Sequence, residues 1–323
     1  MSTIFLQSIA DRFWLNLWIV KSWCENLGLT NQVKAEAFFR ENEGIIKARP
    51  FVKWVGGKRQ LIKQFEQFFP TEFGDYFEPF LGGGAVFFNL QKKKSYLSDI
   101  NEELINTYQT VKDSPEELIA FLSTLEHTKK CYETIRAWDR VKNWQKKHTS
   151  IERAGRFIYL NRTCFNGLHR VNSRGEFNVP MGAYKNPDFV QATNIRNTSE
   201  LLRKTEAEIR LESFERVLAK AKKGDFIYLD PPYDTLTETA NFTSYNKDAF
   251  GRDMQTKLAE TFRALDKKGC KVMLSNHNTP FIRDLYSGFW IKNIRFEIVS
   301  ARRNINSKSD ARGGVEEIVV LNY

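Results

Sequence analysis

The fold of this 323-residue chain is decided by the stretch FIYLDPPY, residues 226–233. Its first four residues form a continuous apolar run, introduced by Lys223-Gly224-Asp225 and followed by a carboxylate and two prolines. A short apolar run without polar alternation is typical of a parallel strand that is buried on both faces. Open α/β sheets bind ligands at the carboxyl ends of such strands, so we expect Asp230 at the ligand-binding edge.

The Asp-Pro-Pro-Tyr end of this stretch suits the recognition of a planar amino group. Pro231 and Pro232 fix φ and lack backbone N–H groups, so the local carbonyls can face a ligand without competing donors. The Asp230 carboxylate only accepts hydrogen bonds, and Tyr233 offers an aromatic face. Together they can hold an amino group by its hydrogens and its ring by stacking. The alternative is a β-turn with a packing tyrosine, because Pro-Pro turns are common in loops.

Composition and charge limit the classes of protein to which the chain can belong. The chain is 41% hydrophobic and 14% aromatic, so it can bury a substantial core and is not a disordered chain. Its length suffices for one large α/β domain with an insertion, or for two modest domains. The formal charge of +10 and the pI near 9.3 favour a polyanionic partner, with a merely soluble basic surface as the alternative.

The positions of cysteine and histidine argue against a metal site and against a disulfide framework. The four residues of each type lie far apart and show no paired ligand spacing, which fits a reducing cytosol. They are Cys24, Cys131, Cys164, Cys270, His127, His148, His169 and His277. We therefore expect no bound metal.

The chain also lacks the signals that direct proteins to or through a membrane. It has no run of about 18 uncharged apolar residues, so we expect no membrane helix. The apolar stretch 4–20 carries Asp11 and Arg12 in its middle and lacks a basic start, so we expect no signal peptide. These features together predict a cytoplasmic protein.

Strand, loop and helix patterns alternate along most of the chain, which predicts an α/β fold with a doubly wound, mostly parallel sheet. An amphipathic helix is expected after Gly56-Gly57, with its apolar residues between 61 and 69, and another helix from Ala85. Strands are expected near residues 76–79, 95–98, 208–211, 226–229, 271–275, 294–299 and 317–323.

These patterns divide the chain into three parts. Residues 1–48 are expected to be a helical N-terminal extension that packs against the core or a partner. Residues 49–112 and 205–323 form the predicted sheet domain. Residues 113–204 begin with helical patterns at 115–125 and 151–160, then become rich in Asn, Arg and Gly. They are predicted to be an inserted, mainly helical domain with a β-hairpin.

A glycine-rich block, EPFLGGG at residues 78–84, stands at a predicted strand-to-helix junction. Glycines there let the backbone approach a ligand, although a tight structural turn explains the block equally well. Asp99 lies 17 residues beyond Gly82, near the position where nucleoside-binding sheets hydrogen-bond ribose hydroxyls. Its alternative role is the N-cap of a helix that starts near Asn101.

The block KWVGGK at residues 53–58 places an indole and two cations beside a flexible turn. Lys58 could clamp a carboxylate, and Trp54 could flank a sulfonium through cation–π attraction.

Residues 156–185 combine basic and aromatic side chains in a way that favours DNA binding. Basic groups neutralise phosphates, arginine reads guanine edges, and aromatic rings wedge between base steps. The alternative is a solvated basic hairpin with core aromatics. A second basic segment, at 301–314, is expected to clamp phosphate or to aid solubility. The side chains in 156–185 are Arg156, Arg162, Arg170, Arg174, Lys185, Tyr159, Phe165, Phe177 and Tyr184, with Glu176 as the opposing acid.

In this order, the blocks resemble the Dam-type (D12 class) DNA adenine-N6 methyltransferases of bacteria and phages, and the related adenine methylases of restriction systems. The resemblance covers roughly residues 51–323 and has the glycine block before the Asp-Pro-Pro-Tyr block, with the insert between them. The matching blocks are 51–58, 78–89, 98–101, 159–184, 230–233, 240–245, 275–277 and 302–323.

The resemblance implies S-adenosyl-L-methionine as cofactor and a catalytic role for Asp230, Pro231, Pro232 and Tyr233. The Asp230 carboxylate and the Pro231 carbonyl would accept the two N6 hydrogens of a flipped adenine, and Tyr233 would stack on its ring. The sheet domain would then be the cofactor-binding catalytic domain. The implied cofactor-binding residues are Trp54, Lys58, Glu78, Phe80, Gly82, Gly84, Asp99 and Asp230.

The resemblance also implies that the inserted domain recognises double-stranded DNA at GATC. Phe165 would intercalate in place of the tyrosine of relatives, and Asn166 would compensate the orphaned partner base. Ala183 stands where some relatives carry a basic residue, so contacts outside the core site are expected to be weaker. The implied DNA-binding residues are Lys53, Phe165, Asn166, Leu168, Arg170, Arg174 and Pro180.

Several alternatives stay open. A methylase acting on cytosine N4 more often has Ser in place of Asp230, and an RNA or protein amide methylase would lack the insert. A non-catalytic DNA-binding module need not retain Trp54, Lys58, Asp99 and Asp230 together. A cognate restriction endonuclease that acts separately is an open partner, and no obligate protein partner is evident.

Overall fold

The computed structural model describes residues 47–234, 250–287, 293–301 and 315–323. Most of the predicted N-terminal extension, the 240–245 block and nearly all of the predicted phosphate-clamping segment at 301–314 lie outside the described residues. Residues 47–323 form one compact unit, which contains both the sheet and the helices of the predicted insert.

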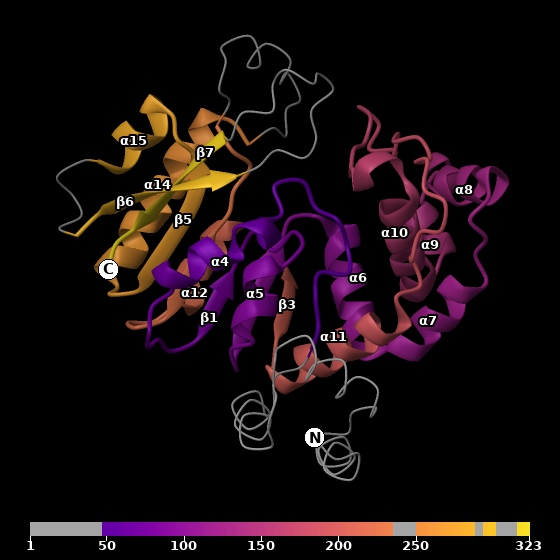
Figure 1. The fold of residues 1–323 in the computed structure, drawn as a ribbon, viewed down its shortest axis with the longest axis horizontal. Helices are drawn as coiled ribbons and strands as arrows, with labels where there is room; N and C mark the ends of the chain where they lie inside the picture. Colours follow the sequence, from indigo (N-terminus) through magenta and orange to yellow (C-terminus); the bar gives the residue numbers. More distant parts are fainter. Residues whose placement is uncertain (1–46, 235–249, 288–292, 302–314) are drawn as a thin grey trace, which may run out of the picture. The chain divides into compact units, whose positions relative to one another are not determined.

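The described residues form a seven-stranded sheet in the order β3-β2-β1-β4-β5-β7-β6 (Figure 1). Strands β1 to β5 are parallel, whereas β7 is antiparallel to both of its neighbours. The predicted α/β fold with a mostly parallel sheet is thus confirmed. The strands are β1 Tyr76–Glu78, β2 Ser95–Asp99, β3 Glu208–Leu211, β4 Phe226–Leu229, β5 Lys271–His277, β6 Arg295–Ala301 and β7 Val315–Leu321.

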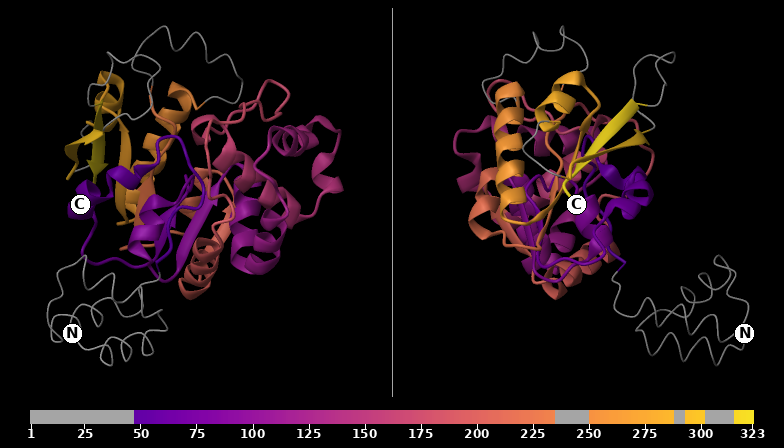
Figure 2. Two further views of the ribbon diagram at one scale, coloured as in Figure 1. Left: turned by 45° about the vertical axis from the view of Figure 1, so that its right-hand side comes forward. Right: turned by 90° about the vertical axis from the view of Figure 1, so that its left-hand side faces the viewer.

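Helices lie on both faces of the sheet (Figure 2). On one face, Ile227 and Leu229 of β4 join a core with Phe262 of α14 Arg252–Lys267. This face is also covered by α12 Val217–Lys220 and α15 Pro280–Tyr286. On the other face, Phe226 and Tyr228 meet the rings of Phe65, Phe69 and Phe73. The all-apolar β4 is therefore buried on both sides, as its sequence predicts.

The prediction of one continuous amphipathic helix after Gly56-Gly57 is wrong. The segment forms three short turns instead: η1 Lys58–Gln60, α4 Ile62–Phe65 and η2 Glu66–Phe68. No side chain caps the start of any of these turns, and Pro70 follows closely, so a longer helix has no favourable start and an early stop.

Helix α6, Glu102–Asp113, follows β2 and has strong end signals. The side chain of Asn101 accepts a hydrogen bond from the backbone N–H of Leu104, which caps the helix. Glu102 and Glu103 in the first turn and Lys112 in the last turn favour the helix dipole. Asn101, not Asp99, is therefore the N-cap.

The helices between residues 113 and 204 pack beside α6, which in turn contacts β3 (Figure 1). Their longest member, α10 Ser150–Thr163, begins with a capping box formed by Thr149 and Glu152. Both helices expected in this region, at 115–125 and 151–160, are present. The remaining elements are α7 Pro115–Ser123, α8 Lys129–Arg136, η3 Ala137–Arg140, α9 Trp144–Lys147, η4 Phe165–Gly167 and α11 Ala192–Lys204.

Neither a membrane-crossing helix nor a metal cluster is found in the part of the chain that the structure describes. Each described helix is too short or too polar to cross a bilayer. No three His, Cys, Asp or Glu side chains of the described residues gather as metal ligands would.

Candidate active site

Three acidic residues stand at the carboxyl ends of three neighbouring parallel strands. Asp99 ends β2, Glu78 ends β1 and Asp230 directly follows β4. Because β2, β1 and β4 are adjacent and parallel, their ends meet at one edge of the sheet. We call these three acids and the 78–84 glycine loop the catalytic edge. The fold thus brings together residues that lie up to 152 positions apart in the sequence.

Asp230 is held by a buried cation and a buried hydroxyl. Lys58 Nζ lies 2.8 Å from Asp230 Oδ1, and Ser275 Oγ donates to the same oxygen at 2.9 Å. Tyr228 in turn shares a hydrogen bond of 3.0 Å with Ser275. No described residue hydrogen-bonds Asp230 Oδ2, so this oxygen is available to accept from a ligand. Lys58 is only 3% exposed, and it also donates to the carbonyl of Gly56 at 2.6 Å.

The ring of Tyr233 is held through its hydroxyl and by two packing contacts. Its hydroxyl donates to Glu317 Oε2 at 2.8 Å, and its ring packs on His277 with centroids 4.8 Å apart. Lys58 Nζ lies 4.6 Å from the ring centroid, which is a cation–π distance. These contacts hold the aromatic face in a defined direction beside Asp230.

The two prolines of the motif differ in their surroundings. Pro231 is buried and Pro232 is exposed. The Pro232 carbonyl accepts a hydrogen bond of 2.8 Å from Gln255 Nε2 of α14. The expectation that the local carbonyls lack competing donors is therefore wrong for Pro232. The prolines supply no N–H donor, but the Gln255 side chain of α14 does. Only the Pro231 carbonyl keeps the predicted role.

Asp99 is tied to the glycine loop and to the start of α6. Its two oxygens accept from the backbone N–H groups of Gly82 and Asn101, each at 3.0 Å. Burial raises the pKa of Asp99 above its usual value. Each oxygen keeps a second lone pair, so the carboxylate can still accept from a hydroxyl.

The glycine loop needs its glycines. Gly82 has φ +46° and Gly84 has φ +66°, which are left-handed conformations that favour glycine. A Cβ added to Gly82 would lie 2.6 Å from Trp54 Cδ1, so the indole packs directly on the loop. Phe80 is stacked on Phe214 at 5.4 Å, which anchors the loop to the sheet domain.

Glu78 is buried beneath the loop and supports the start of α5, Ala85–Leu90. Glu78 Oε2 accepts from the Tyr76 hydroxyl at 2.8 Å and from the Phe87 N–H at 3.0 Å. Burial raises the pKa of Glu78 to about 8, so the side chain is mostly protonated at neutral pH. A neutral carboxyl avoids placing a second buried negative charge next to Asp230.

These residues fit a nucleoside that carries an amino-acid tail. The edge offers a hydrogen-bond acceptor at Asp99, close backbone approach at Gly82 and Gly84, and a buried cation at Lys58. This donor and acceptor set matches ribose hydroxyls and a carboxylate, which are the polar parts of S-adenosyl-L-methionine.

Residues 165–180, which we call the reading segment, lie beyond α10 and return on themselves. Isolated antiparallel bridges pair Cys164 with Met181 and Val171 with Phe177. Phe165 is 51% exposed, while Asn166 and Gly167 adopt left-handed conformations that turn the chain. An exposed aromatic at the tip of a tight turn is the form that a base-step wedge requires.

The other predicted DNA-binding residues surround this turn. The backbone of Lys53 is held at both its N–H and its C=O by the side-chain amide of Asn161, each at 2.7 Å. Lys53 Nζ donates to the Tyr184 hydroxyl at 2.9 Å. Arg170 donates to Asn178 Oδ1 at 2.7 Å, and Arg174 is 76% exposed beside Glu176. Leu168 is half-buried, and the Pro180 carbonyl accepts from the N–H of Phe165 at 2.9 Å.

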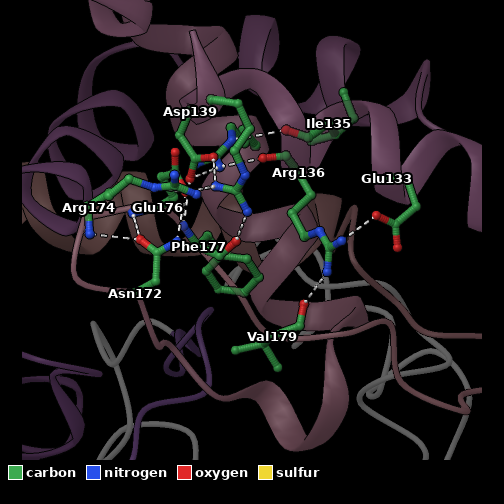
Figure 3. Close-up of polar contacts among 11 residues, drawn as sticks. Glu133, Ile135, Arg136, Asp139, Asn172, Arg174, Glu176, Phe177 and Val179 are labelled. Atoms are coloured by element: carbon green, nitrogen blue, oxygen red, sulfur yellow. Dashed lines mark hydrogen bonds and ion pairs between the residues drawn. The ribbon is translucent and has the colours of Figure 1, made fainter. Parts of the chain in front are cut away.

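Asp139 holds the reading segment onto the helical layer, a role that the sequence did not suggest (Figure 3). Its Oδ2 accepts from Arg156 at 2.6 Å and from the backbone N–H of Phe177 at 2.7 Å. Arg140 pairs with Asp139 and donates to the Phe177 carbonyl at 2.6 Å. The Asp139 carboxylate, the two guanidinium groups and the Phe177 backbone thus form one hydrogen-bonded network.

The same network corrects the expected role of Arg156. Arg156 is 5% exposed, pairs with Asp139 and donates to the carbonyl of Ile135 at 3.0 Å, so it cannot neutralise a phosphate. Tyr159 and Phe177 are also buried, so they serve the core. The number of basic residues in 156–185 does not reveal that Arg156 is already paired, because the acid that neutralises it lies 17 residues earlier in the sequence.

An open groove of about 830 Å³ between α6 and β3 contains none of the predicted site residues. Gln109 and Lys112 of α6 donate to the backbone carbonyls of Ile209 and Ala207 in this groove. They cover the open edge of the sheet, which is a common protection against strand pairing. We assign this groove no part in catalysis.

Comparison with known proteins agrees with this geometry. Residues 54–300 match the family of D12 class N6 adenine-specific DNA methyltransferases. The chain is 44% identical over 280 residues to the type II methyltransferase M1.LlaDCHI of Lactococcus lactis subsp. cremoris, covering 86% of this chain and 96% of that protein. It is 43% identical over 298 residues to the type II methyltransferase M.MjaIII of Methanocaldococcus jannaschii, covering 86% and 100%. It is 35% identical over 277 residues to the DNA adenine methylase of Escherichia coli (strain K12), covering 85% and 95%.

Proposed function

This chain belongs to the D12 class N6 adenine-specific DNA methyltransferases, and we propose that it methylates a flipped adenine within GATC sites of double-stranded DNA. The family identifies the reaction as methyl transfer to adenine N6, with S-adenosyl-L-methionine as the implied methyl donor. The target sequence, the flipping of the base and the role of each residue belong to the proposal.

One observation carries the catalytic part of the proposal: Asp230 has one oxygen saturated and one oxygen open. Lys58 and Ser275 hold Oδ1, and Lys58 also lies over the Tyr233 ring, so Oδ2 is left to accept from a ligand. The lone pair of adenine N6 is delocalised into the ring. If Asp230 Oδ2 and the Pro231 carbonyl accept both N6 hydrogens, the nitrogen becomes more tetrahedral and more nucleophilic.

The other residues of the catalytic edge would hold the cofactor, whose chemistry is to present an electrophilic methyl group. Asp99 would accept from the ribose hydroxyls, and the loop from Glu78 to Gly84 would enclose the methionine part. Trp54 and Lys58 would contact the remaining cofactor groups, with Phe80 anchoring the loop. Holding both reactants at one edge of the sheet gains rate through orientation.

Residues 113–204 would form the target-recognition domain. Phe165 would enter the duplex where the adenine leaves, with Asn166 facing the orphaned base, which offsets part of the few kcal/mol lost on unstacking. Lys53, Leu168, Arg170 and Pro180 would read base edges, and the exposed Arg174 would meet phosphate. GATC is proposed because Leu168 and Arg170 occupy the reading positions of Dam-type enzymes.

The names of two relatives include the words type II methyltransferase, which supports a biological role beside a restriction endonuclease. The methylated site would then protect DNA from a nuclease that acts separately. No contact between the two proteins is required.

Digestion of a treated plasmid tests the proposed function. Unmethylated plasmid is incubated with the protein and S-adenosyl-L-methionine, then cut with one nuclease that requires N6-methyladenine in GATC and one that is blocked by it. We expect cutting by the first and protection from the second. Methyl groups mapped to another sequence, or to cytosine, would contradict the proposal, and Asp230→Asn is the inactive control.

A further inference from the structure

His169 lies in the reading segment, and its ring packs against aromatic rings of other segments as well as its own. It stands between Leu168 and Arg170, two of the residues proposed to read bases. Arg170 is exposed, whereas the His169 ring is largely covered by three aromatic rings. The ring centroids lie 5.6 Å from Trp54, 5.3 Å from Phe157 and 5.9 Å from Phe177.

The Trp54 ring has a second neighbour on the cofactor side. The indole packs on Gly82, whose N–H is held by Asp99. Its plane lies within 22° of the His169 ring, so the two rings are stacked. The Asp99–Gly82 contact, the indole and the imidazole therefore form a continuous series from the cofactor loop to the reading segment.

The backbone next to Trp54 is fixed independently of the cofactor. Asn161 hydrogen-bonds both the N–H and the C=O of Lys53, and it also donates to the Gly167 carbonyl at 3.2 Å. These bonds involve no residue of the glycine loop, whereas the Trp54 ring contacts both Gly82 of that loop and His169 of the reading segment.

The surroundings of His169 favour an uncharged ring. Burial, with a smaller contribution from the Arg156 guanidinium, lowers the pKa of His169 to about 4. The Arg156 charge is itself paired with Asp139. A neutral imidazole can stack on an indole without bringing a second cation toward Arg156.

We propose that His169 is a positioning residue that couples cofactor binding to base reading, by transmitting the position of Trp54 to Leu168 and Arg170. This inference rests on the proposed function of the catalytic edge and the reading segment. A filled cofactor site would fix the glycine loop and the indole on it, and the stacked imidazole would then fix the backbone between the two reading residues. Coupling of this kind is reciprocal, so DNA would tighten cofactor binding by the same factor.

The experiment measures the Kd of S-adenosyl-L-homocysteine, an unreactive probe, by calorimetry, with and without a saturating GATC duplex. For the unchanged protein we expect the duplex to lower this Kd by about 5- to 150-fold, the usual range for coupled sites. We call the Kd without duplex divided by the Kd with duplex the coupling ratio. The leucine of His169→Leu is apolar but not planar. We therefore expect this variant to bind each ligand alone within about 3-fold of the unchanged protein, with a coupling ratio close to 1. His169→Phe keeps a neutral flat ring and should retain the coupling.

The chain offers a matched control in His148, which stacks on Trp138 with ring centroids 3.8 Å apart in the same helical region. His148→Leu removes a stacked ring whose partners Trp138, Trp144 and Glu152 belong to neither the glycine loop nor the reading segment, so its coupling ratio should not change. If His169→Leu does not fold, His169→Gln, which is also not aromatic, replaces it.

The outcomes separate this inference from the proposed function. Failure of the unchanged protein to bind either ligand would overturn the proposed function itself. Binding of both ligands without coupling, or full coupling in His169→Leu, would overturn only the role of His169. Equal loss in the Leu and Phe variants would show that the stacked ring is not what transmits the effect.

Discussion

The catalytic edge and the reading segment are held in place by different means. Asp230 follows a strand buried on both faces, and a buried ammonium and a buried hydroxyl fix one of its oxygens. The reading segment forms isolated bridges and turn hydrogen bonds but no regular strand, and the Asp139 network ties it to the helices. The carboxylate proposed to act on adenine is thus placed by regular structure, whereas the side chains proposed to enter DNA project from a turn held by side chains of other elements.

The largest expected effect comes from changing the catalytic edge. Asp230→Asn keeps the shape of the side chain but removes its negative charge, and it replaces one acceptor with a donor. We expect the single-turnover rate of methyl transfer to fall by about 10³-fold, the upper range for loss of one electrostatic contact. DNA binding by the same variant, measured by fluorescence anisotropy, should persist, because no DNA-reading residue changes. Near-normal turnover would contradict the assigned role.

The next largest effect is expected at the anchor of the reading segment. Asp139→Asn leaves the Arg156 guanidinium buried without its ion partner, which should lower the free energy of unfolding by about 3–5 kcal/mol. Urea denaturation measures this change. Glu116→Gln is the control, since its pair with Arg196 is exposed and should be worth less than about 1 kcal/mol. Equal losses in the two variants would mean that Asp139 is not a structural anchor.

A smaller effect is expected at the exposed tip. Phe165→Ala removes the proposed wedge, so kcat/KM should fall by about 10- to 100-fold, in line with one lost aromatic contact to a base. Fluorescence of 2-aminopurine at the target position measures flipping, and the signal should fall in parallel. Because Phe165 is 51% exposed, stability should change by less than about 0.5 kcal/mol. A duplex with a mismatched target, which costs less to flip, should restore part of the rate. No recovery on that duplex would argue against the wedge.

The smallest expected effect is a pH dependence of the free energy of unfolding that is caused by His169, whose ring stacks on Trp54 beside the glycine loop. The pKa of His169 is lowered from 6.5 to about 4, so between these values the unfolded chain binds a proton that the folded chain does not. The free energy of unfolding should therefore fall as pH decreases from about 6.5 to about 4, and the contribution should be complete above about 6.5. Denaturation curves of His169→Phe should lack this part of the slope. Identical slopes in both proteins would show that the imidazole is not kept neutral by folding.

Features set by local sequence could be predicted, because they depend on neighbouring residues. The apolar run of β4 and the glycines before α5 placed Asp230 and Gly82 at one edge without any knowledge of distant contacts. The helix expected at 61–69 failed because apolar spacing says nothing about the missing cap. The direction of β7 could not be read either, since an apolar run is compatible with parallel and antiparallel pairing.

Roles that arise from distant pairs could not be predicted. Asp139 became an anchor only because the fold brings it to Arg156 and Phe177. Glu317 reaches the Tyr233 hydroxyl from β7, 84 residues away. Ser275 lies in a block that resembles the family, but its contact with Asp230 depends on the pairing of β4 with β5. Sequence spacing carries no signal for such partners.

The most direct test of the separation between chemistry at the catalytic edge and base reading by the reading segment compares single-turnover rates on a GATC duplex and on a duplex in which a G·C base pair of the site is replaced by A·T. Asp230→Asn should slow both reactions by the same factor, so that the ratio of the two rates stays unchanged. Arg170→Ala should lower that ratio by about 5- to 150-fold, the discrimination expected from one bidentate base contact, without slowing the altered duplex. A changed ratio in Asp230→Asn, or equal slowing of both duplexes in Arg170→Ala, would contradict the separation of chemistry from reading.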